Sequence, residues 1–197
     1  MADKPPENAT SDRPMPRADA PASAQPNFKR DVPAGDNRPR LICNDCGFIN
    51  YENPKVVVGA VVREGERILM CRRAINPRQG FWTLPAGYLE INETTADGAR
   101  REAWEEARAK IEIDGLLAVY SIPRLSQVQV IYRARFAEPG IEPGPESLEV
   151  GMFAWDDIPW EEIAFPSVRW ALGHYREIGE TPHFAARTNP PGELGNF

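Results

Sequence analysis

Apolar and polar residues follow one another in blocks along most of the chain, and these blocks predict the ordered elements. Residues 56–63 (VVVGAVVR) form a nearly continuous β-branched run, which is typical of a buried strand. Residues 67–73 (RILMCRR) follow a turn at Gly65 and predict a second strand. Residues 81–84 (FWTL) predict a short third strand, which Pro85 ends.

Three later segments also have strand patterns. Residues 116–122 and 150–155 are largely apolar, and a loop rich in proline and glycine at 138–147 precedes the second of them. In residues 127–136 every second position from Val128 is apolar and the positions between are mostly polar, which indicates a half-buried strand.

Two segments have the spacing of helices. Thr94 to Arg108 begins with Thr94 and Asp97 in capping-box spacing. Ser167 to Ile178 places apolar residues on one face. Mixed strands with one helix inserted between them predict an α/β layered domain.

The two ends of the chain differ from this domain. Residues 1–40 contain eight prolines and seven alanines with few larger apolar side chains, so they bury too little surface to offset the entropy of ordering. We expect a disordered tail over residues 1–40 and a short segment around a cysteine pair over 41–55. The α/β domain then covers 56–178, and a C-terminal tail covers 179–197.

Composition narrows the class of protein. A net charge of −6 argues against general nucleic-acid binding, which needs a basic surface. The longest apolar run, residues 56–62, is too short to cross a bilayer, and the N-terminus lacks the apolar block of a secretory signal. Three cysteines do not make a disulfide framework, so we expect a cytoplasmic protein.

Three glutamates share one face of the first predicted helix. Glu102, Glu105 and Glu106 fall within an arc of about 100°, where each like-charged pair costs about 3 kcal/mol at a dielectric near 20. Taken alone, three such residues favour a solvated acidic face. Apolar Ala103 and Trp104 beside them, and the sharp turn at 84–87 leading to the helix, instead favour a site for a hard divalent cation such as Mg²⁺ or Mn²⁺.

The spacing around this cluster resembles the Nudix box. Gly87, Glu93 and the run 101–106 (REAWEE) match its positions over 23 residues, GYLEINETTADGARREAWEEARA. The resemblance implies a Nudix hydrolase, an α/β/α sandwich with a mixed sheet that cleaves a pyrophosphate bond in a nucleoside diphosphate derivative. The family usually has glycine where this chain has Arg108, so we expect the helix to end without a left-handed cap.

The resemblance also implies residue roles. Glu102, Glu105 and Glu106 would hold the metal ion with help from a backbone carbonyl near Ala86 or Gly87, and Glu105 and Glu106 would count as catalytic. Glu93 and Arg101 would form a salt bridge that braces the loop against the helix. A bound metal ion would lower the pKa of a water that attacks phosphorus, and a carboxylate would take its proton.

Further stretches resemble the ADP-ribose/FAD pyrophosphatases of plants and their bacterial relatives. They include GFWTLPAGYLE, SIPRLSQVQVIYRARF and GPESLEV, with Pro123 near a proline of ADP-ribose-cleaving members. The motif SQPWPFP, which marks NADH-cleaving relatives, is absent. This likeness implies ADP-ribose or FAD as substrate, with AMP as one product. The alternatives are NADH or another dinucleotide, an oxidised nucleoside triphosphate, and a catalytically silent domain that senses a nucleotide.

Candidate residues outside the box carry competing interpretations. Glu146 and Glu149 lie in a loop that supplies a catalytic glutamate in several ADP-ribose-cleaving relatives, and Glu146 is the better candidate. The sequence is equally compatible with a solvated acid that has no catalytic role. Arg72 and Arg73 are candidate phosphate contacts or plain surface charges.

Three more side chains are weaker candidates for binding roles. Arg124 and Arg133 are weaker phosphate candidates, and Trp82 fits a core position better than an adenine-stacking one. Members of the family often dimerise, which leaves a homodimer open.

The segment CNDCG resembles one knuckle of a zinc ribbon. A structural zinc site needs four ligands, usually from two knuckles. The stretch where relatives carry the first pair has no cysteine or histidine, and the other candidates are Cys71, in a predicted strand, and the distant His174 and His183. The sequence therefore favours a knuckle that folds without metal over zinc at Cys43 and Cys46.

Overall fold

The structure is a computed structural model that describes residues 27–195. The chain divides into two compact units, and the boundary in the sequence lies between Glu52 and Asn53. No helix in residues 27–195 is long and apolar enough to span a membrane. The first unit contains β1 (Phe28–Asp31), β2 (Arg40–Cys43) and β3 (Ile49–Asn50). The strands of the second unit are β4 (Lys55–Glu64), β5 (Arg67–Arg73), β6 (Trp82–Thr83), β7 (Ala86–Tyr88), β8 (Ile111–Ile122), β9 (Gln127–Phe136) and β10 (Ser147–Ala154). Its helices are α1 (Thr95–Ala107), α2 (Pro166–Ile178) and the 3-10 turns η1 (Pro123–Leu125), η2 (Trp155–Asp157) and η3 (Trp160–Glu162).

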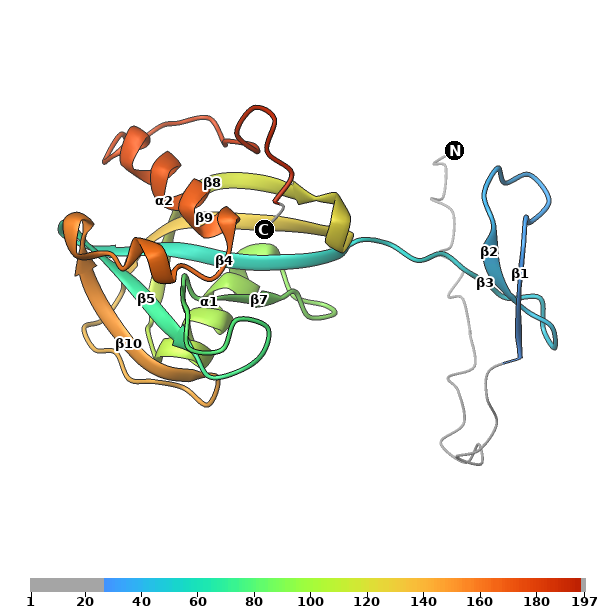
Figure 1. Cartoon of the computed structure of the whole chain (residues 1–197), viewed down its shortest axis with the longest axis horizontal. Helices are drawn as coiled ribbons and strands as arrows, with labels where there is room; N and C mark the ends of the chain where they lie inside the picture. Colours follow the sequence, from blue (N-terminus) through green and yellow to red (C-terminus); the bar gives the residue numbers. More distant parts are fainter. Residues whose placement is uncertain (1–26, 196–197) are drawn as a thin grey trace, which may run out of the picture. The chain divides into compact units, whose positions relative to one another are not determined.

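The second unit is built on one mixed sheet (Figure 1). Its main strands run in the order β10-β5-β4-β9-β8, with β6 paired to β5 and β7 paired to β4. The central pair β4/β9 is parallel and the other pairs are antiparallel. The middle of strand β4 is buried, as its continuous β-branched run predicted.

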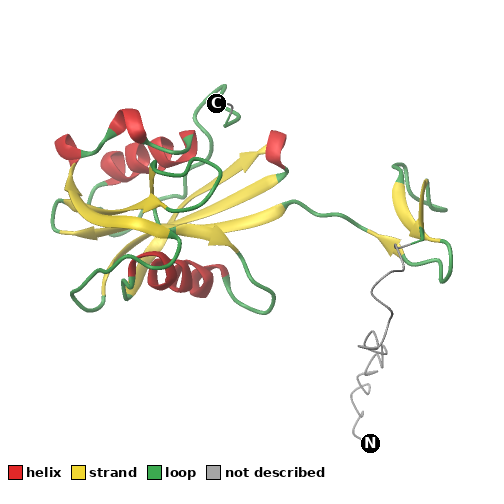
Figure 2. Cartoon of the chain, turned by 60° about the horizontal axis from the view of Figure 1, so that its bottom comes forward, coloured by secondary structure: helices red, strands yellow, loops and turns green. Residues whose placement is uncertain are grey.

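One helix covers each face of this sheet (Figure 2). On one face Ala103 and Ala107 of α1 pack with Ala60 and Val62 of β4. On the other face α2 packs, through residues such as Leu172, into a larger cluster that includes Trp82, which is 6% exposed. The α/β/α layering is therefore confirmed, and Trp82 is a core residue.

Ordered structure begins earlier than predicted. Strand β1 pairs with β2 from Phe28↔Cys43 to Asp31↔Arg40, although residues 1–40 were expected to be disordered. The strand is short and exposed, so its stability comes from pairing with β2, which composition does not reveal. The rest of the predicted tail, residues 1–26, lies outside the described residues.

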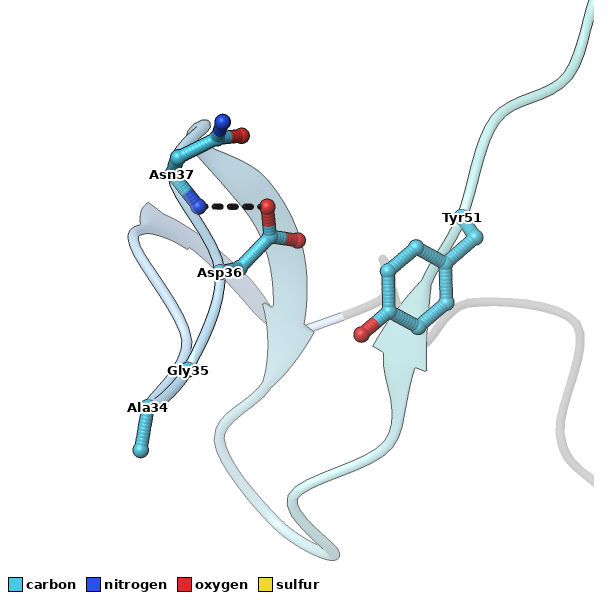
Figure 3. A pocket seen from close by; sticks show the side chains of 5 residues that line it. All are labelled: Ala34, Gly35, Asp36, Asn37 and Tyr51. Atoms are coloured by element: carbon cyan, nitrogen blue, oxygen red, sulfur yellow. Dashed lines mark hydrogen bonds between the residues drawn. The ribbon is translucent and has the colours of Figure 1, made fainter.

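The turn between β1 and β2 borders a shallow hollow of about 460 Å³ (Figure 3). Ala34, Gly35, Asp36, Asn37 and Tyr51 line it. The Asp36 carboxylate accepts hydrogen bonds from the Asn37 amide (2.7 Å) and from Arg40 Nε (2.9 Å), so it is already paired within the hairpin. None of the residues predicted to carry chemistry lines this hollow.

The predicted C-terminal tail makes specific contacts with the domain. Arg187 forms a bridge to β8, donating its amide to Leu117 O and accepting from the Val119 amide, both at 2.9 Å. The side chain of Asn189 bonds both backbone groups of Ser121 at 2.8 Å. This segment occupies the edge of β8 that β9 does not use.

Two local predictions about the box were wrong or incomplete. Arg108 ends α1 in the left-handed conformation (φ 52°), with its amide bonded to Trp104 O at 2.9 Å. The helix thus ends in a left-handed cap, in which glycine is usual, although Arg108 carries a side chain. The turn at residues 84–87 also contains strand β7, which becomes a strand by pairing with Val57–Gly59 of β4.

Candidate active site

The loop before α1 is fixed by a cap and by a close packing contact. Thr94 is the N-cap and its hydroxyl accepts from the Asp97 amide at 3.1 Å, as predicted. Gly98 lies where any side chain would collide with the Glu93 carboxylate and with Val58. Glycine at this position therefore allows the loop to lie directly against the first turn of the helix.

Arg101 joins this loop to the helix face. Its guanidinium donates to Glu93 through Nε (3.0 Å) and Nη2 (2.8 Å), and Nη2 also donates to the Tyr88 carbonyl (2.9 Å). Its Nη1 donates to Glu102 (2.7 Å) and Glu105 (2.8 Å). The hydrogen bond from Arg101 lowers the pKa of Glu93, so the ion pair expected here is present and charged.

Glu102 is buried beneath β7. It is 8% exposed, and an added side chain at Gly87 would collide with both of its carboxylate oxygens. Burial raises the pKa of Glu102, and the charges of Glu105 and Glu146 raise it further, while Arg101 opposes them. Because Gly87 has no side chain, the backbone of β7 lies in direct contact with the Glu102 carboxylate.

Glu106 is the most buried of the three box glutamates. It is 5% exposed and accepts a hydrogen bond from the Ala86 amide of β7 at 3.1 Å. Burial raises the pKa of Glu106 to about 8, and the charges of Glu102 and Glu146 add to this effect. The amide bond and the charge of Arg73 offset only part of it. A carboxylate in this state gains most from a cation placed beside it.

Glu105 points differently from its neighbours. Its side chain is half-exposed and its carboxylate is bound to Arg101. Within residues 27–195, no three carboxylate, thiol or imidazole groups converge closely enough to hold one ion. Glu102 and Glu106 thus lie together under β7, and Glu105 must turn away from Arg101 to join them.

The loop before β10 brings Glu146 to the same place. Its charge contributes to the raised pKa of both Glu102 and Glu106. The loop is held to the helix by the Gly144 amide, which donates to the Glu106 carbonyl at 3.0 Å. On its other side the Glu146 carbonyl accepts from the Ala74 amide at 2.8 Å.

Glu149, the second loop acid considered, forms an ion pair with Arg72 at 3.6 Å. Arg72 Nε also donates to the Gly80 carbonyl at 2.9 Å, so this arginine fixes the loop that follows β5. Neither residue is among the main causes of the raised pKa of Glu102 or Glu106.

Arg73 acts on the buried Glu106 through its positive charge, which lowers the pKa of that carboxyl. Its Nε donates to the Pro77 carbonyl at 2.9 Å, and its guanidinium lies over the Phe165 ring at 5.2 Å. Of the two neighbouring arginines, Arg73 is therefore the one at the candidate site.

The remaining arginine candidates differ in their surroundings. Arg124 lies in η1 between β8 and β9. Arg133 is 4% exposed, and its Nη1 donates to the carbonyls of Gly179 and Thr181 at 2.9 Å. The suggestion that Arg133 binds phosphate is wrong, because its side chain is buried and its Nη1 is bonded to carbonyls that follow α2.

Two structural contributors to the site were not found from the sequence. Gly144 packs against the helix C-terminus, where a side chain would collide with the Glu105 carbonyl. The Ala86 amide anchors Glu106. The only local sign of the role of Gly144 was its position between two prolines in the loop. The role of the Ala86 amide could not be seen in the sequence, because it depends on the pairing of β7 with β4.

The cysteine knuckle lacks the ligands of a zinc ribbon. Cys43 and Cys46 are free, and hydrogen bonds from the backbone amides of Cys46 and Asp45 lower the pKa of the Cys43 thiol. Within the described chain, no third cysteine, histidine or acid joins them to form a metal-binding group. Residues 1–42 contain no cysteine or histidine at all. The donor set therefore does not fit a structural zinc ion, which needs four ligands.

Comparison with known proteins identifies the family. Residues 53–171 match the NUDIX domain model, and residues 24–52 match the model of the Nudix N-terminal zinc ribbon. The chain belongs to the Nudix family. As a Nudix hydrolase it is an enzyme of a family that generally uses divalent metal ions.

One solved structure supports this assignment over most of the chain. The NUDIX hydrolase from Nitrosomonas europaea is 43% identical, with a TM-score of 0.78, and the match covers 85% of this chain and 97% of that one.

Curated relatives have several names. A MutT-like protein of Streptomyces ambofaciens is 39% identical over 52% of this chain and 64% of its own length. An ADP-ribose pyrophosphatase of Methanocaldococcus jannaschii is 27% identical over 62% of this chain and 78% of its own length. The NAD-capped RNA hydrolase NudC of Citrobacter koseri is 25% identical over 60% of this chain and 46% of its own length. The chain thus spans less than two thirds of the Streptomyces and Citrobacter proteins.

Proposed function

We propose that this Nudix hydrolase cleaves the pyrophosphate bond of ADP-ribose, and of FAD as a second substrate, to release AMP. The observation that carries this proposal is the pairing of Glu102 and Glu106 under β7, a group that the charge of Glu146 also reaches. Both glutamates are buried, and their pKa values are raised first by burial and then by the charges of their acidic neighbours. Such a group favours a divalent cation bound to a diphosphate.

The chain offers this cation carboxylate and carbonyl oxygens, which are the ligand types that it prefers. Glu102, Glu105 and Glu106, with a backbone carbonyl at Gly87, would hold Mg²⁺ or Mn²⁺, because both prefer oxygen ligands. When bound, the ion neutralises the diphosphate and lowers the pKa of a coordinated water.

The remaining roles are assigned to groups around these carboxylates. Glu146 accepts the proton of the attacking water, since its loop places it beside the buried pair. Arg73 contacts a phosphate oxygen, because a guanidinium suits phosphate geometry and its charge already reaches Glu106. The ion pair of Glu93 and Arg101 holds the loop against the helix while Glu105 turns from Arg101 to the metal ion.

The substrate assignment rests on similarity beyond the box. The strand and loop sequences resemble ADP-ribose/FAD pyrophosphatases, and the Methanocaldococcus relative is named an ADP-ribose pyrophosphatase. The odd number of cysteines, three, does not suit a disulfide framework and favours a reducing compartment such as the cytoplasm. A small-molecule substrate suits the net charge of −6 better than a nucleic acid.

A substrate panel tests the proposal. The purified protein is incubated with ADP-ribose, FAD, NADH, diadenosine polyphosphates and nucleoside triphosphates, with Mg²⁺ or Mn²⁺, and products are separated by chromatography. We expect AMP and ribose 5-phosphate from ADP-ribose at the highest kcat/KM, followed by AMP and FMN from FAD. Preferential cleavage of NADH, release of inorganic pyrophosphate from triphosphates, or binding without hydrolysis would each contradict it.

A further inference from the structure

The turn at the end of β2 places two thiols side by side. The Cys43 amide donates to the Phe48 carbonyl at 2.8 Å and the Gly47 amide donates to the Cys43 carbonyl at 2.9 Å, which closes the turn. The side chains of Cys43 and Cys46 are in hydrogen-bond contact, and the backbone amides of Asp45 and Cys46 also donate to the Cys43 sulfur. The hydrogen bonds of the turn therefore hold the two sulfur atoms close together.

Asn27, the residue before β1, forms hydrogen bonds with the two residues that lie between the cysteines. Asn27 accepts from the Asn44 amide through its carbonyl (2.9 Å) and from Asn44 Nδ2 through its side-chain oxygen (2.7 Å). Its own Nδ2 donates to Asp45 at 3.0 Å. These bonds tie β1 to the residues between the two cysteines, so the hairpin is closed by hydrogen bonds.

Both thiols are also accessible, unlike the third cysteine. Cys46 is exposed and Cys43 is partly exposed, whereas Cys71 is 1% exposed within the sheet. Accessible thiols that favour the thiolate are the ones that exchange with disulfides, and a buried thiol does not. The chain thus separates one reactive pair from one inert cysteine.

We propose that Cys43 and Cys46 are a redox-active dithiol that forms a reversible disulfide by exchange with a low-molecular-weight disulfide. The Cys43 thiolate attacks one sulfur of the small disulfide and displaces a small thiolate. The Cys46 thiolate then attacks the Cys43 sulfur of the mixed disulfide and displaces the second small thiol. The protein loses two electrons and two protons, and the small disulfide is reduced to two thiols.

Oxidation of the whole protein by glutathione disulfide tests this proposal. The reduced protein is incubated with glutathione disulfide at increasing ratios to glutathione, the exchange is quenched with acid, and intact mass and iodoacetamide labelling are measured. We expect a loss of mass equal to two hydrogen atoms, with both thiols labelled before oxidation and neither after. Dithiothreitol should reverse the change.

Two variants separate this exchange from other cysteine chemistry. Cys43→Ser leaves Cys46 alone, so oxidation should stop at a stable glutathione adduct. Cys71→Ser should form the internal disulfide at the same glutathione ratio as the unchanged protein. If Cys43 and Cys46 remain fully labelled, or carry separate glutathione adducts in the unchanged protein, the proposal is wrong.

Metal analysis of the protein as purified gives an independent test. A redox-active dithiol predicts less than stoichiometric zinc and thiols that react freely. One zinc ion per chain that protects both thiols would overturn the proposal, and so would one zinc ion shared by two chains in a dimer.

Discussion

At the scale of single residues, Glu106 has the clearest consequence for pH dependence. Its pKa in the folded chain is about 8, above the usual value near 4.5 of an exposed glutamate. A carboxyl with a raised folded pKa contributes stability that is fully present below the unfolded pKa. That contribution is lost as pH rises through the folded value.

We therefore expect the stability of the wild-type protein in EDTA to fall relative to that of Glu106→Gln between about pH 5 and about pH 9. The glutamine keeps an acceptor for the Ala86 amide but carries no charge. The free energy of unfolding is measured by urea denaturation at each pH. A difference between the two proteins that does not change with pH would contradict the raised pKa.

Glu146 allows a second test at a single position. As the proposed proton acceptor it should affect the chemical step, so Glu146→Gln should lower kcat for ADP-ribose by about 100-fold or more. KM should change little, because the residue is not assigned to substrate binding. The matched control is Glu149→Gln, which removes the ion pair with Arg72 and should keep kcat within about threefold. Wild-type turnover in Glu146→Gln would remove the residue from the mechanism.

Arg108 adopts a backbone conformation that favours glycine. A left-handed residue other than glycine costs about 1–2 kcal/mol, and the stacking of Arg108 over the Trp104 ring at 5.5 Å returns part of this. Arg108→Gly should thus stabilise the domain by about 0.5–1 kcal/mol, measured by chemical denaturation. Arg108→Ala, which keeps the strain and loses the stacking, should destabilise it. The opposite order of the two variants would show that the side-chain contacts dominate.

At the scale of elements, the candidate site depends on one loop packed against one helix end. The loop before β10 donates from the Glu142 amide to the Ala107 carbonyl (2.9 Å) and from the Gly144 amide to the Glu106 carbonyl (3.0 Å). These bonds satisfy carbonyls at the end of α1 that a helix leaves without partners. They also fix the distance between Glu146 and the box glutamates.

Gly144→Ala should separate these elements, because the added methyl group would collide with the Glu105 carbonyl. We expect a loss of about 1–3 kcal/mol in stability and a fall in kcat of about tenfold or more, as the loop carries Glu146 away. Gly173→Ala in α2 is the control, since its added group meets open space and should stabilise the helix by about 0.5–1 kcal/mol. Unchanged kcat in Gly144→Ala would show that loop position is not critical.

Sequence patterns predicted the elements that have their own periodicity. The buried strand β4, the cap at Thr94 and the apolar face of α2 follow from local spacing. Strand β7 and the hairpin of β1 were missed because each is stabilised by pairing with a distant partner. The burial of Arg133 was missed for the same reason, since its partners lie some fifty residues later in the chain. The box positions were predictable from spacing, but the turn of Glu105 toward Arg101 was not.

At the scale of the whole molecule, the C-terminal segment completes the sheet edge. Arg187 and Asn189 bond the backbone of β8, and Phe184 lies against the Arg133 guanidinium at 4.4 Å. An edge strand left open presents unpaired amides and carbonyls to other chains. The segment therefore contributes both to stability and to solubility.

Deletion of residues 181–197 should lower the stability of the domain by at least about 2 kcal/mol, because several hydrogen bonds worth about 1 kcal/mol each are lost. It should also promote self-association through β8. Thermal unfolding and light scattering after size-exclusion chromatography measure the two effects. Asn189→Ala should give a smaller loss without association. A stable, monodisperse truncated protein would contradict the role given to this segment.

The position of this segment in the chain also bears on biosynthesis. Residues 181–195 leave the ribosome after every strand that they cover, so β8 emerges with one side bare. Arg133 likewise lacks the Thr181 carbonyl until the segment arrives. During synthesis this side of β8 is therefore the last part of the sheet to find its partners.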